Sequence, residues 1–299
     1  MGTTPEIVAI LNPAAAGGKT LKSLPRIHGI LKRVDRPYAI YVTKGPGDAI
    51  EAAKSFADDG AKRILAVGGD GTVNEVANGI YRSGGEAALA LVPFGHGTDF
   101  ARTIGATKSV EQAVLRAAER DPARIDLGLA TFEDGSDRAF INIAGMGFDA
   151  LVAEKAQRSR LPGGNLPYLG SALMTLVGFK NLEVHLEVNG DQIDTKGVFV
   201  QVANAQYMGG GYHMAPMAKI DDGKLDVCVV GDFGKYELIK AIPGVYKGRH
   251  VTNPKFTHIE TTAVRISTAT PAMVQLDGEL IGQTPVTFSV LPGAISLIK

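Results

Sequence analysis

The sequence predicts an α/β N-terminal domain with a parallel sheet, followed by a β-rich, sandwich-like C-terminal domain. In the first 125 residues, four short apolar runs are each followed by a helical stripe, a pattern typical of a parallel sheet. After about Asp126, short strands separated by turn residues dominate. The length of 299 residues also exceeds that of a usual single domain. We therefore expect domains at 1–125 and 126–290, with the tail 291–299 returning to the first domain.

Composition narrows the classes of function. Lys plus Arg and Asp plus Glu each number 31, so the chain has no net field that attracts nucleic acid, and we expect no nucleic-acid partner. The single cysteine, Cys228, excludes a disulfide framework and a cysteine-based zinc site. No basic leader followed by an apolar segment opens the sequence, and no apolar run reaches the roughly 18 residues that span a bilayer. We expect a cytoplasmic protein.

The elements of the first domain follow one another in regular order. Apolar runs predict strands at Ile7–Leu11, Tyr38–Thr43, Ile64–Val67 and Ala88–Pro93. A helix should follow each strand, and both Asp48 with Glu51 and Ser109 with Gln112 have the spacing of helix caps. Ligands of parallel sheets bind beyond the carboxyl ends of the strands. The loops that fall there, and that we expect to converge, are Asn12–Lys19, Thr43–Asp48, Gly68–Asn74 and Gly95–Asp99.

The third of these loops, Gly68-Gly69-Asp70-Gly71-Thr72, has the composition of a phosphate-binding turn. Its glycines let backbone amides approach an anion, and the helix that follows adds partial positive charge. Thr72 and Glu75 have capping-box spacing, so an ordinary glycine turn is the alternative. Asp70 favours a site in which a metal ion or a sugar hydroxyl separates its carboxylate from phosphate. The first loop matches neither the dinucleotide fingerprint nor the Walker pattern, because Pro13 stands where the latter needs glycine.

Short strands are predicted throughout the second domain. They are Arg124–Thr131, Ala139–Ile143, Glu183–Val188, Val198–Ala203, Lys224–Val230, Ala263–Ser267, Ala272–Leu276 and Val286–Val290. Asn189-Gly190 predicts a tight hairpin turn. The helical pattern at Leu166–Leu182 favours a helix packed on the sheet over a segment that contacts acyl chains. Turns at Asp221–Lys224 and Asp277–Glu279 carry carboxylates. The first suits a hard cation such as Mg²⁺, and an ordinary hairpin turn is the alternative for both.

In order and spacing, a set of motifs resembles the diacylglycerol kinase catalytic-domain superfamily, in particular its bacterial soluble lipid kinases. NAD kinases and phosphofructokinases share the Gly-Gly-Asp-Gly turn, so the resemblance implies an N-terminal domain like theirs, while the motifs of the second domain separate this chain from them. The resemblance covers nearly the whole length. Its motifs are Asn12-Pro13, Gly68–Glu75, Pro93-Phe94-Gly95 leading to Asp99–Arg102, Asn142 to Gly147–Ala150, Pro216 to Asp222-Gly223, and Asp277-Gly278-Glu279.

The resemblance implies an ATP-dependent lipid kinase that phosphorylates a lipid hydroxyl, such as that of diacylglycerol, in a cleft between the domains. Glu279, with Asp277 beside it on an extended segment, would accept the hydroxyl proton, and Mg²⁺ near Asp70 would neutralise charge. A second, structural Mg²⁺ would be held by Asp222 and by the backbone carbonyls of Lys219 and Lys224. The residues implied to bind ATP are Asn12, Pro13, Ala14, Ala15, Ala16, Thr43, Gly68, Gly69, Asp70, Gly71, Thr72, Val73, Asn74, Glu75, His96 and Thr98.

One motif departs from the family pattern. Gly95-His96-Gly97-Thr98-Asp99 stands where the family usually has Gly-Thr-Gly-Asn-Asp, and His96 could fill the nucleotide pocket, alter the affinity for ATP or add a phosphate contact. Two other functions stay open: a kinase relative impaired at this loop that only binds lipid or nucleotide, and a kinase of a soluble metabolite such as NAD. We expect membrane contact to be peripheral and transient, since the sequence has neither an anchor nor a basic cluster.

Overall fold

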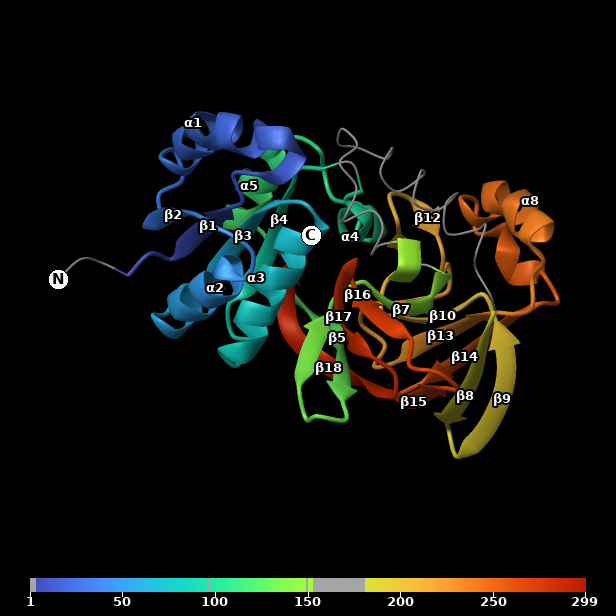
Figure 1. Ribbon diagram of the computed structural model, residues 1–299. Helices are drawn as coiled ribbons and strands as arrows, with labels where there is room; N and C mark the ends of the chain where they lie inside the picture. Colours follow the sequence, from blue (N-terminus) through green and yellow to red (C-terminus); the bar gives the residue numbers. More distant parts are fainter. Residues whose placement is uncertain (1–3, 96, 149, 153–180) are drawn as a thin grey trace. The chain divides into compact units, whose positions relative to one another are not determined.

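The computed structural model describes residues 4–95, 97–148, 150–152 and 181–299 (Figure 1). The chain forms two compact units: unit 1 comprises Met1–Asp126 with Gly293–Lys299, and unit 2 comprises Leu127–Pro292. The predicted fold class is confirmed, because unit 1 is a parallel sheet with helices and unit 2 is built mainly of β-strands. Within these described residues, no helix is long and apolar enough to cross a membrane.

Unit 1 contains a parallel sheet ordered β2 (Tyr38–Val42), β1 (Ile7–Leu11), β3 (Arg63–Gly68) and β4 (Ala88–Pro93). Its helices are α1 (Lys19–Leu31), α2 (Asp48–Asp58), α3 (Asp70–Arg82), α4 (Asp99–Thr103) and α5 (Val110–Glu119). Every residue of β1 is buried, as a continuous apolar run requires in a strand that is covered on both faces. The end of the chain joins this sheet, because residues 296–298 of β18 (Val286–Ile298) pair in parallel with β4.

Unit 2 contains two sheets that share a core. One includes β5 (Ala123–Phe132), β6 (Asp137–Phe140), β18, β15 (Ala263–Thr268), β8 (Leu182–Val188) and β9 (Asp191–Gly197). The other is ordered β14 (Phe256–Thr261), β13 (Leu225–Val230), β10 (Phe199–Ala203), β7 (Ile143–Gly147), β16 (Met273–Leu276) and β17 (Glu279–Gln283). Buried side chains of both sheets form one cluster, as in a sandwich. The hairpin β11 (Tyr207–Met208) and β12 (Tyr212–His213), helix α8 (Lys235–Val245) and a 3-10 turn at Arg249–Thr252 also lie in unit 2.

The hairpin predicted at Asn189-Gly190 is confirmed. These two residues have φ angles of 54° and 88°, and a two-residue turn of this kind needs positive φ at both positions. The turn joins β8 to β9 in antiparallel register. In β8 the side chains of Val184, Leu186 and Val188 are buried, while those of Glu183 and Glu187 are exposed.

One element prediction in unit 2 was wrong. The predicted strand Ala139–Ile143 is interrupted, because the amides of residues 141–143 donate hydrogen bonds to the Asp277 carboxylate instead of continuing one ladder. The pattern at Leu166–Leu182 lies outside the described residues up to position 180, but its last residue, Leu182, is the first residue of β8. The sequence reading also did not identify β9, β14, β17 or α8.

In unit 1, the helix cap predicted at Ser109 is confirmed, and the one predicted at Asp48 is wrong. Ser109 caps α5, since its hydroxyl accepts a hydrogen bond from the Gln112 amide at 3.4 Å. Asp48 does not cap a helix but is itself the first residue of α2. Its carboxylate accepts from the amide of Lys44 at 2.7 Å and from the hydroxyl of Tyr41 at 3.1 Å. The aspartate therefore holds the loop after β2 rather than the helix start.

Candidate functional site

Backbone hydrogen bonds join the loops at the carboxyl ends of the unit 1 strands. The Asn12 amide donates to the Val67 carbonyl at 3.1 Å, and the Thr43 amide donates to the Leu11 carbonyl at 2.9 Å. The Asn12 side chain then reaches the third loop, where its Nδ2 donates to Thr72 Oγ1 at 3.2 Å. The structure thus brings together three of the predicted ATP-binding segments: the loop after β1, Thr43 and the glycine turn.

The glycine turn leads directly into α3. A Cβ at Gly68 would lie 2.3 Å from Thr72 Oγ1, so this position has room for glycine alone. Gly69 is the residue before the helix, and no described side chain caps the helix start. The first amides of an α-helix have no partner within the helix, and they attract an anion together with the helix dipole. The start of α3 therefore offers donors that a phosphate group can use.

The loop that follows β1 has an unusual backbone. Ala16, Gly17 and Gly18 have φ angles of 51°, 65° and 84°, all in the left-handed region. The side chain of Asn12 accepts from the Ala14 amide at 3.0 Å, and Thr20 Oγ1 donates to the Asn12 carbonyl at 2.6 Å. These bonds fix the loop at both ends. Its small side chains leave the backbone accessible, which suits the predicted role of residues 12–16 in binding nucleotide.

The predicted capping box at Thr72 and Glu75 was wrong. Such a box would make Thr72 the N-cap and residue 73 the first helical residue, but the helix begins three residues earlier, at Asp70. Glu75 instead accepts hydrogen bonds from the amides of Gly47 and Ala49, at 2.9 and 3.1 Å. A carboxylate placed at the start of α2 satisfies amides there and complements the helix dipole. Glu75 therefore joins α3 to the loop before α2, and Thr72 joins α3 to Asn12.

Asp70 directs its carboxylate at the start of α4. Its Oδ1 accepts from the Phe100 amide at 3.1 Å. Burial raises the pKa of Asp70 above its ordinary value, and hydrogen bonds from backbone amides, that of Phe100 foremost, oppose this rise. The carboxylate is thus held by a neighbouring loop, which reduces its repulsion of an anion at the start of α3.

Thr98 lies in the same neighbourhood with a strained backbone. Its φ is 47°, a left-handed conformation that disfavours β-branched residues and that asparagine tolerates better. The left-handed conformation explains why the family usually has asparagine at this position. This chain has threonine there instead. His96, the other departure from the family pattern, lies outside the described residues.

The segment Asp277-Gly278-Glu279 in unit 2 is a tight turn, as its residues predicted, and not the extended segment that was expected with the resemblance. Asp277 and Gly278 have φ angles of 50° and 91°, and Leu276 pairs with Glu279 across the turn. The Asp277 carboxylate accepts from the amides of residues 141, 142 and 143 at 2.9, 3.0 and 2.9 Å. Both of its oxygens are engaged by backbone donors. Asp277 is therefore built to hold the chain between β6 and β7.

Glu279 has a different environment from its neighbour. It is the first residue of β17, and its side chain is 42% exposed. One carboxylate oxygen lies 3.5 Å from the Arg138 guanidinium, whose side chain is 15% exposed. The arginine can orient the carboxylate without enclosing it. Of the two acidic residues predicted to act on a hydroxyl, Glu279 is the one whose position suits proton transfer.

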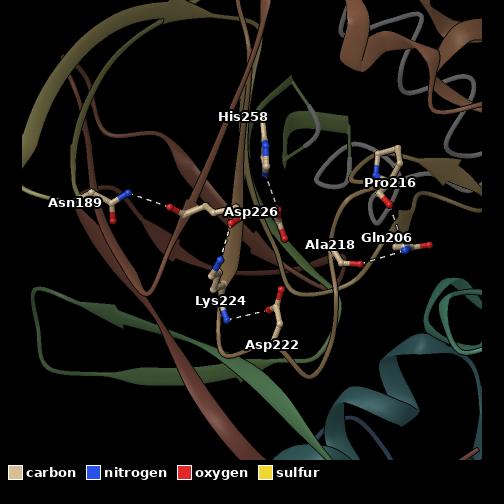
Figure 2. A network of polar contacts seen from close by, with 9 residues as sticks. Asn189, Gln206, Pro216, Ala218, Asp222, Lys224, Asp226 and His258 are labelled. Atoms are coloured by element: carbon tan, nitrogen blue, oxygen red, sulfur yellow. Dashed lines mark hydrogen bonds and ion pairs between the residues drawn. The ribbon is translucent and has the colours of Figure 1, made fainter.

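The turn predicted to hold a structural Mg²⁺ lies before β13. Asp222 Oδ1 accepts from the Lys224 amide at 3.1 Å, and Gly223 has a φ of 73° (Figure 2). Nearby, the side-chain amide of Gln206 donates to the carbonyls of Pro216 and Ala218 at 3.4 and 3.1 Å. Carboxylate and carbonyl oxygens are the donors that a hard cation prefers. The oxygens predicted to bind at Lys219, Asp222 and Lys224 are of this type, and Mg²⁺ at this turn stays a prediction.

A second polar cluster beside this turn escaped the sequence analysis. Asp226, His258 and Glu260 bring ligand atoms within 4.8 Å of one another (Figure 2). They lie on the paired strands β13 and β14, with Asp226 opposite Glu260. The cluster could be predicted only from the register of these two strands. His258 Nε2 lies 2.6 Å from Asp226, and Lys224 Nζ lies 2.7 Å from Glu260. Carboxylates that face each other across strands repel. Here the histidine and the lysine offset that repulsion, so we interpret the cluster as structural.

Comparison with known proteins agrees with these motifs. Residues 6–130 match the diacylglycerol kinase catalytic domain, and residues 142–299 match the YegS C-terminal NAD kinase beta sandwich-like domain. A diacylglycerol kinase of Mycobacterium tuberculosis is 28% identical, with 98% of this chain and 95% of the relative covered. A probable lipid kinase YegS-like of Chromohalobacter salexigens is also 28% identical, with 90% and 86% covered.

Solved structures extend the likeness to the fold. The crystal structure of a putative diacylglycerol kinase from Bacillus anthracis is 26% identical, has a TM-score of 0.79, and aligns with 99% of this chain and 98% of its own. Both domain models match in the order in which the two units occur along the chain. The chain belongs to the bacterial diacylglycerol kinase and YegS-like lipid kinase family.

Proposed function

We propose that this protein is an ATP-dependent kinase that transfers the γ-phosphate to the hydroxyl of a diacylglycerol-like lipid. The observation that carries the proposal is the start of α3, where a glycine turn without a side-chain cap is tied through Thr72 to the Asn12 loop. Helix amides and small-residue loops in this arrangement suit a chain of phosphates. The relatives named above are described as diacylglycerol or lipid kinases, which supports a lipid as the acceptor.

Glu279 is the proposed general base. In the transfer, the lipid hydroxyl oxygen attacks the γ-phosphorus while its proton moves to the Glu279 carboxylate. The bond from the γ-phosphorus to the bridging oxygen of the β-phosphate breaks, and ADP leaves. A positioned base contributes about 10²–10⁴-fold in rate. Arg138 would orient Glu279, and Asp277, whose oxygens bind three backbone amides, would act as a positioning residue.

Two Mg²⁺ roles complete the proposal. Near Asp70, the ion would neutralise the developing charge on the phosphates. At Lys219, Asp222 and Lys224 it would stabilise the turn before β13 and take no part in chemistry. The proposal requires the ATP-binding residues of unit 1 and Glu279 of unit 2 to act on one ATP and one lipid during turnover.

The test is a transfer assay with purified protein, γ-labelled ATP, Mg²⁺ and a panel of acceptors. The panel contains diacylglycerol, monoacylglycerol, ceramide, sphingosine and NAD. We expect label in diacylglycerol or a close analogue, and loss of transfer when EDTA removes Mg²⁺. Label in NAD alone would support the soluble-metabolite alternative. Intact ATP binding by calorimetry with no transfer to any acceptor would support a protein that only binds.

A further inference from the structure

Exposed aromatic side chains lie on helix α8 of unit 2 and directly after it. Tyr236, on the helix, is 70% exposed. Tyr246, one residue beyond the end of the helix, is 46% exposed and stacks on Tyr212 with ring centroids 4.3 Å apart. The other large apolar residues that are exposed in the described ranges, Leu21, Val42 and Ile281, lie on separate elements. Leu238 of α8 packs against a buried cluster, so the helix is anchored in unit 2 by one side and exposes Tyr236 on another.

Basic residues accompany the tyrosines. Tyr236, Lys240 and Pro243 recur at intervals of three or four residues and are all exposed, so they share one face of the helix. Lys247, also exposed, lies two residues beyond the end of the helix. The Lys240 ammonium lies 4.4 Å from the centroid of the Tyr236 ring. Aromatic rings and lysines at this spacing form an amphipathic surface. Its apolar part consists of aromatic rings and the methylene groups of the lysines, and these do not form a groove.

The surface is also positively charged, although the whole chain is neutral. Segment 235–249 contains Lys235, Lys240, Lys247 and Arg249 against a single acid, Glu237. That acid is bound by Lys255 Nζ at 2.8 Å and by the Gly234 amide at 2.8 Å. Since the basic side chains are exposed, their charge faces solvent. Helix α8 and the segment after it therefore form a basic cluster, which the sequence analysis did not predict because its lysines are five and seven residues apart.

We propose that this face of α8, together with the basic residues that follow the helix, is a docking surface for a bilayer that contains anionic lipid. Lysines beside a membrane are attracted by anionic headgroups, and tyrosine rings favour the depth of the headgroups. A protein helix would need an apolar groove or stripe to dock against, whereas this surface offers the exposed Tyr236 ring beside the Lys240 ammonium. The inference rests on the proposed function, because a kinase that acts on a membrane lipid must reach the bilayer.

The first experiment uses the absence of tryptophan from the chain. Tyr236→Trp creates a single reporter on α8, and Ser55→Trp creates one at an exposed site on α2. Each is mixed with phosphatidylcholine vesicles that contain or lack phosphatidylglycerol. We expect a blue shift in the emission of Tyr236→Trp with the anionic vesicles and none for Ser55→Trp in the same samples. Vesicle binding without a shift at position 236 would overturn the proposal.

The second experiment removes charge. We expect Lys240→Gln with Lys247→Gln to lower the partition coefficient onto anionic vesicles about 25-fold, about fivefold for each lysine. The matched control, Lys62→Gln with Lys196→Gln, removes two exposed lysines from β-strand and loop positions elsewhere and should change binding less than twofold. Equal losses in the two variants would contradict the assignment to α8.

Activity separates this inference from the proposed function. With a short-chain diacylglycerol dissolved as monomers, the Lys240/Lys247 variant should turn over like the wild type, while on anionic vesicles its KM should rise with kcat retained. Equal vesicle kinetics for both variants would overturn the docking surface and leave the kinase intact. Membrane binding through α8 in a protein that phosphorylates no lipid would support the surface and contradict the kinase.

Discussion

Two turns, one in each unit, use aspartate in the same way beside different partners. In unit 1, Asp70 follows Gly69 and bonds the Phe100 amide at the start of α4. In unit 2, Asp277 precedes Gly278 and bonds three amides between β6 and β7. Both carboxylates fasten one segment of backbone to another. In the proposed function, the groups that meet a ligand are their neighbours: the amides at the start of α3 in one unit and Glu279 in the other.

The two turns also differ in the surroundings of the aspartate. Asp277 accepts from three backbone amides with both of its oxygens, at 2.9–3.0 Å. Asp70 has a raised pKa because burial outweighs its backbone hydrogen bonds. We interpret Asp277 as structural. For Asp70, a place beside the phosphates belongs to the proposed function.

The largest expected change in stability follows from Asp277→Asn. One oxygen of the asparagine can accept hydrogen bonds, while its NH₂ group faces a backbone donor. Because hydrogen bonds to a charged group contribute about 1.5–3 kcal/mol each, we expect a loss of about 3 kcal/mol. Urea denaturation followed by circular dichroism measures it. A loss below 0.5 kcal/mol, roughly that of a surface substitution, would refute the fastening role.

A smaller loss is expected from Asp70→Ala. The substitution removes the acceptor at the start of α4, and loss of a cap costs about 0.5–2 kcal/mol. Asp70→Asn is the matched control, because its amide oxygen can still accept from the Phe100 amide. We expect the alanine variant to be the less stable of the two. Both variants should lose turnover, because in the proposed function Asp70 lies beside the ion that the phosphates bind. Equal stability of both variants and the wild type would show that Asp70 does not fasten the start of α4.

Acid should weaken unit 2 through His250. Burial lowers the pKa of His250 from its ordinary value of 6.5, and its hydrogen bond with the Met214 carbonyl only partly opposes this. As pH falls below about 6.5, the unfolded chain takes up a proton before the folded chain does, so the free energy of unfolding decreases. Denaturation at pH 7.5 and 5.5 tests this. His250→Gln should lose less stability over this interval than the wild type, while His28→Gln, at an exposed site in unit 1, should follow the wild type.

The smallest expected effect is a gain. Thr98 has a φ of 47°, and asparagine adopts this left-handed conformation at lower cost. Thr98→Asn should stabilise the protein by about 1 kcal/mol, measured by thermal unfolding. Thr98→Val, which keeps the β-branch and removes the hydroxyl, should bring no gain. A gain from valine equal to that from asparagine would show that the backbone conformation is not the cause.

Much of the fold could be predicted from local patterns. The strands of unit 1 are continuous apolar runs, and their predicted bounds differ from β1–β4 by at most one residue at each end. Asn189-Gly190 and Ser109 use turn and cap chemistry that depends on neighbouring residues alone. These predictions succeed because the causes lie within a few residues of each other.

The site required tertiary information that the sequence does not display. Glu75 has the spacing of a cap within its own helix but bonds amides 26 and 28 residues away. Asp277 interrupts a predicted strand more than 130 residues before it, and Asp226 meets His258 only through the register of β13 and β14. In each case a side chain satisfies distant backbone or a distant charge, and periodicity carries no signal of that partner.

The measurement that tests the central claim most directly is the kcat of Glu279→Gln beside its free energy of unfolding. The substitution keeps the size of the side chain and removes its capacity to accept a proton. The account predicts a kcat lowered by about 10²–10⁴-fold with ATP binding retained and unfolding within about 0.5 kcal/mol of the wild type, as for an exposed position. A kcat close to that of the wild type would contradict the assignment of Glu279 as the base.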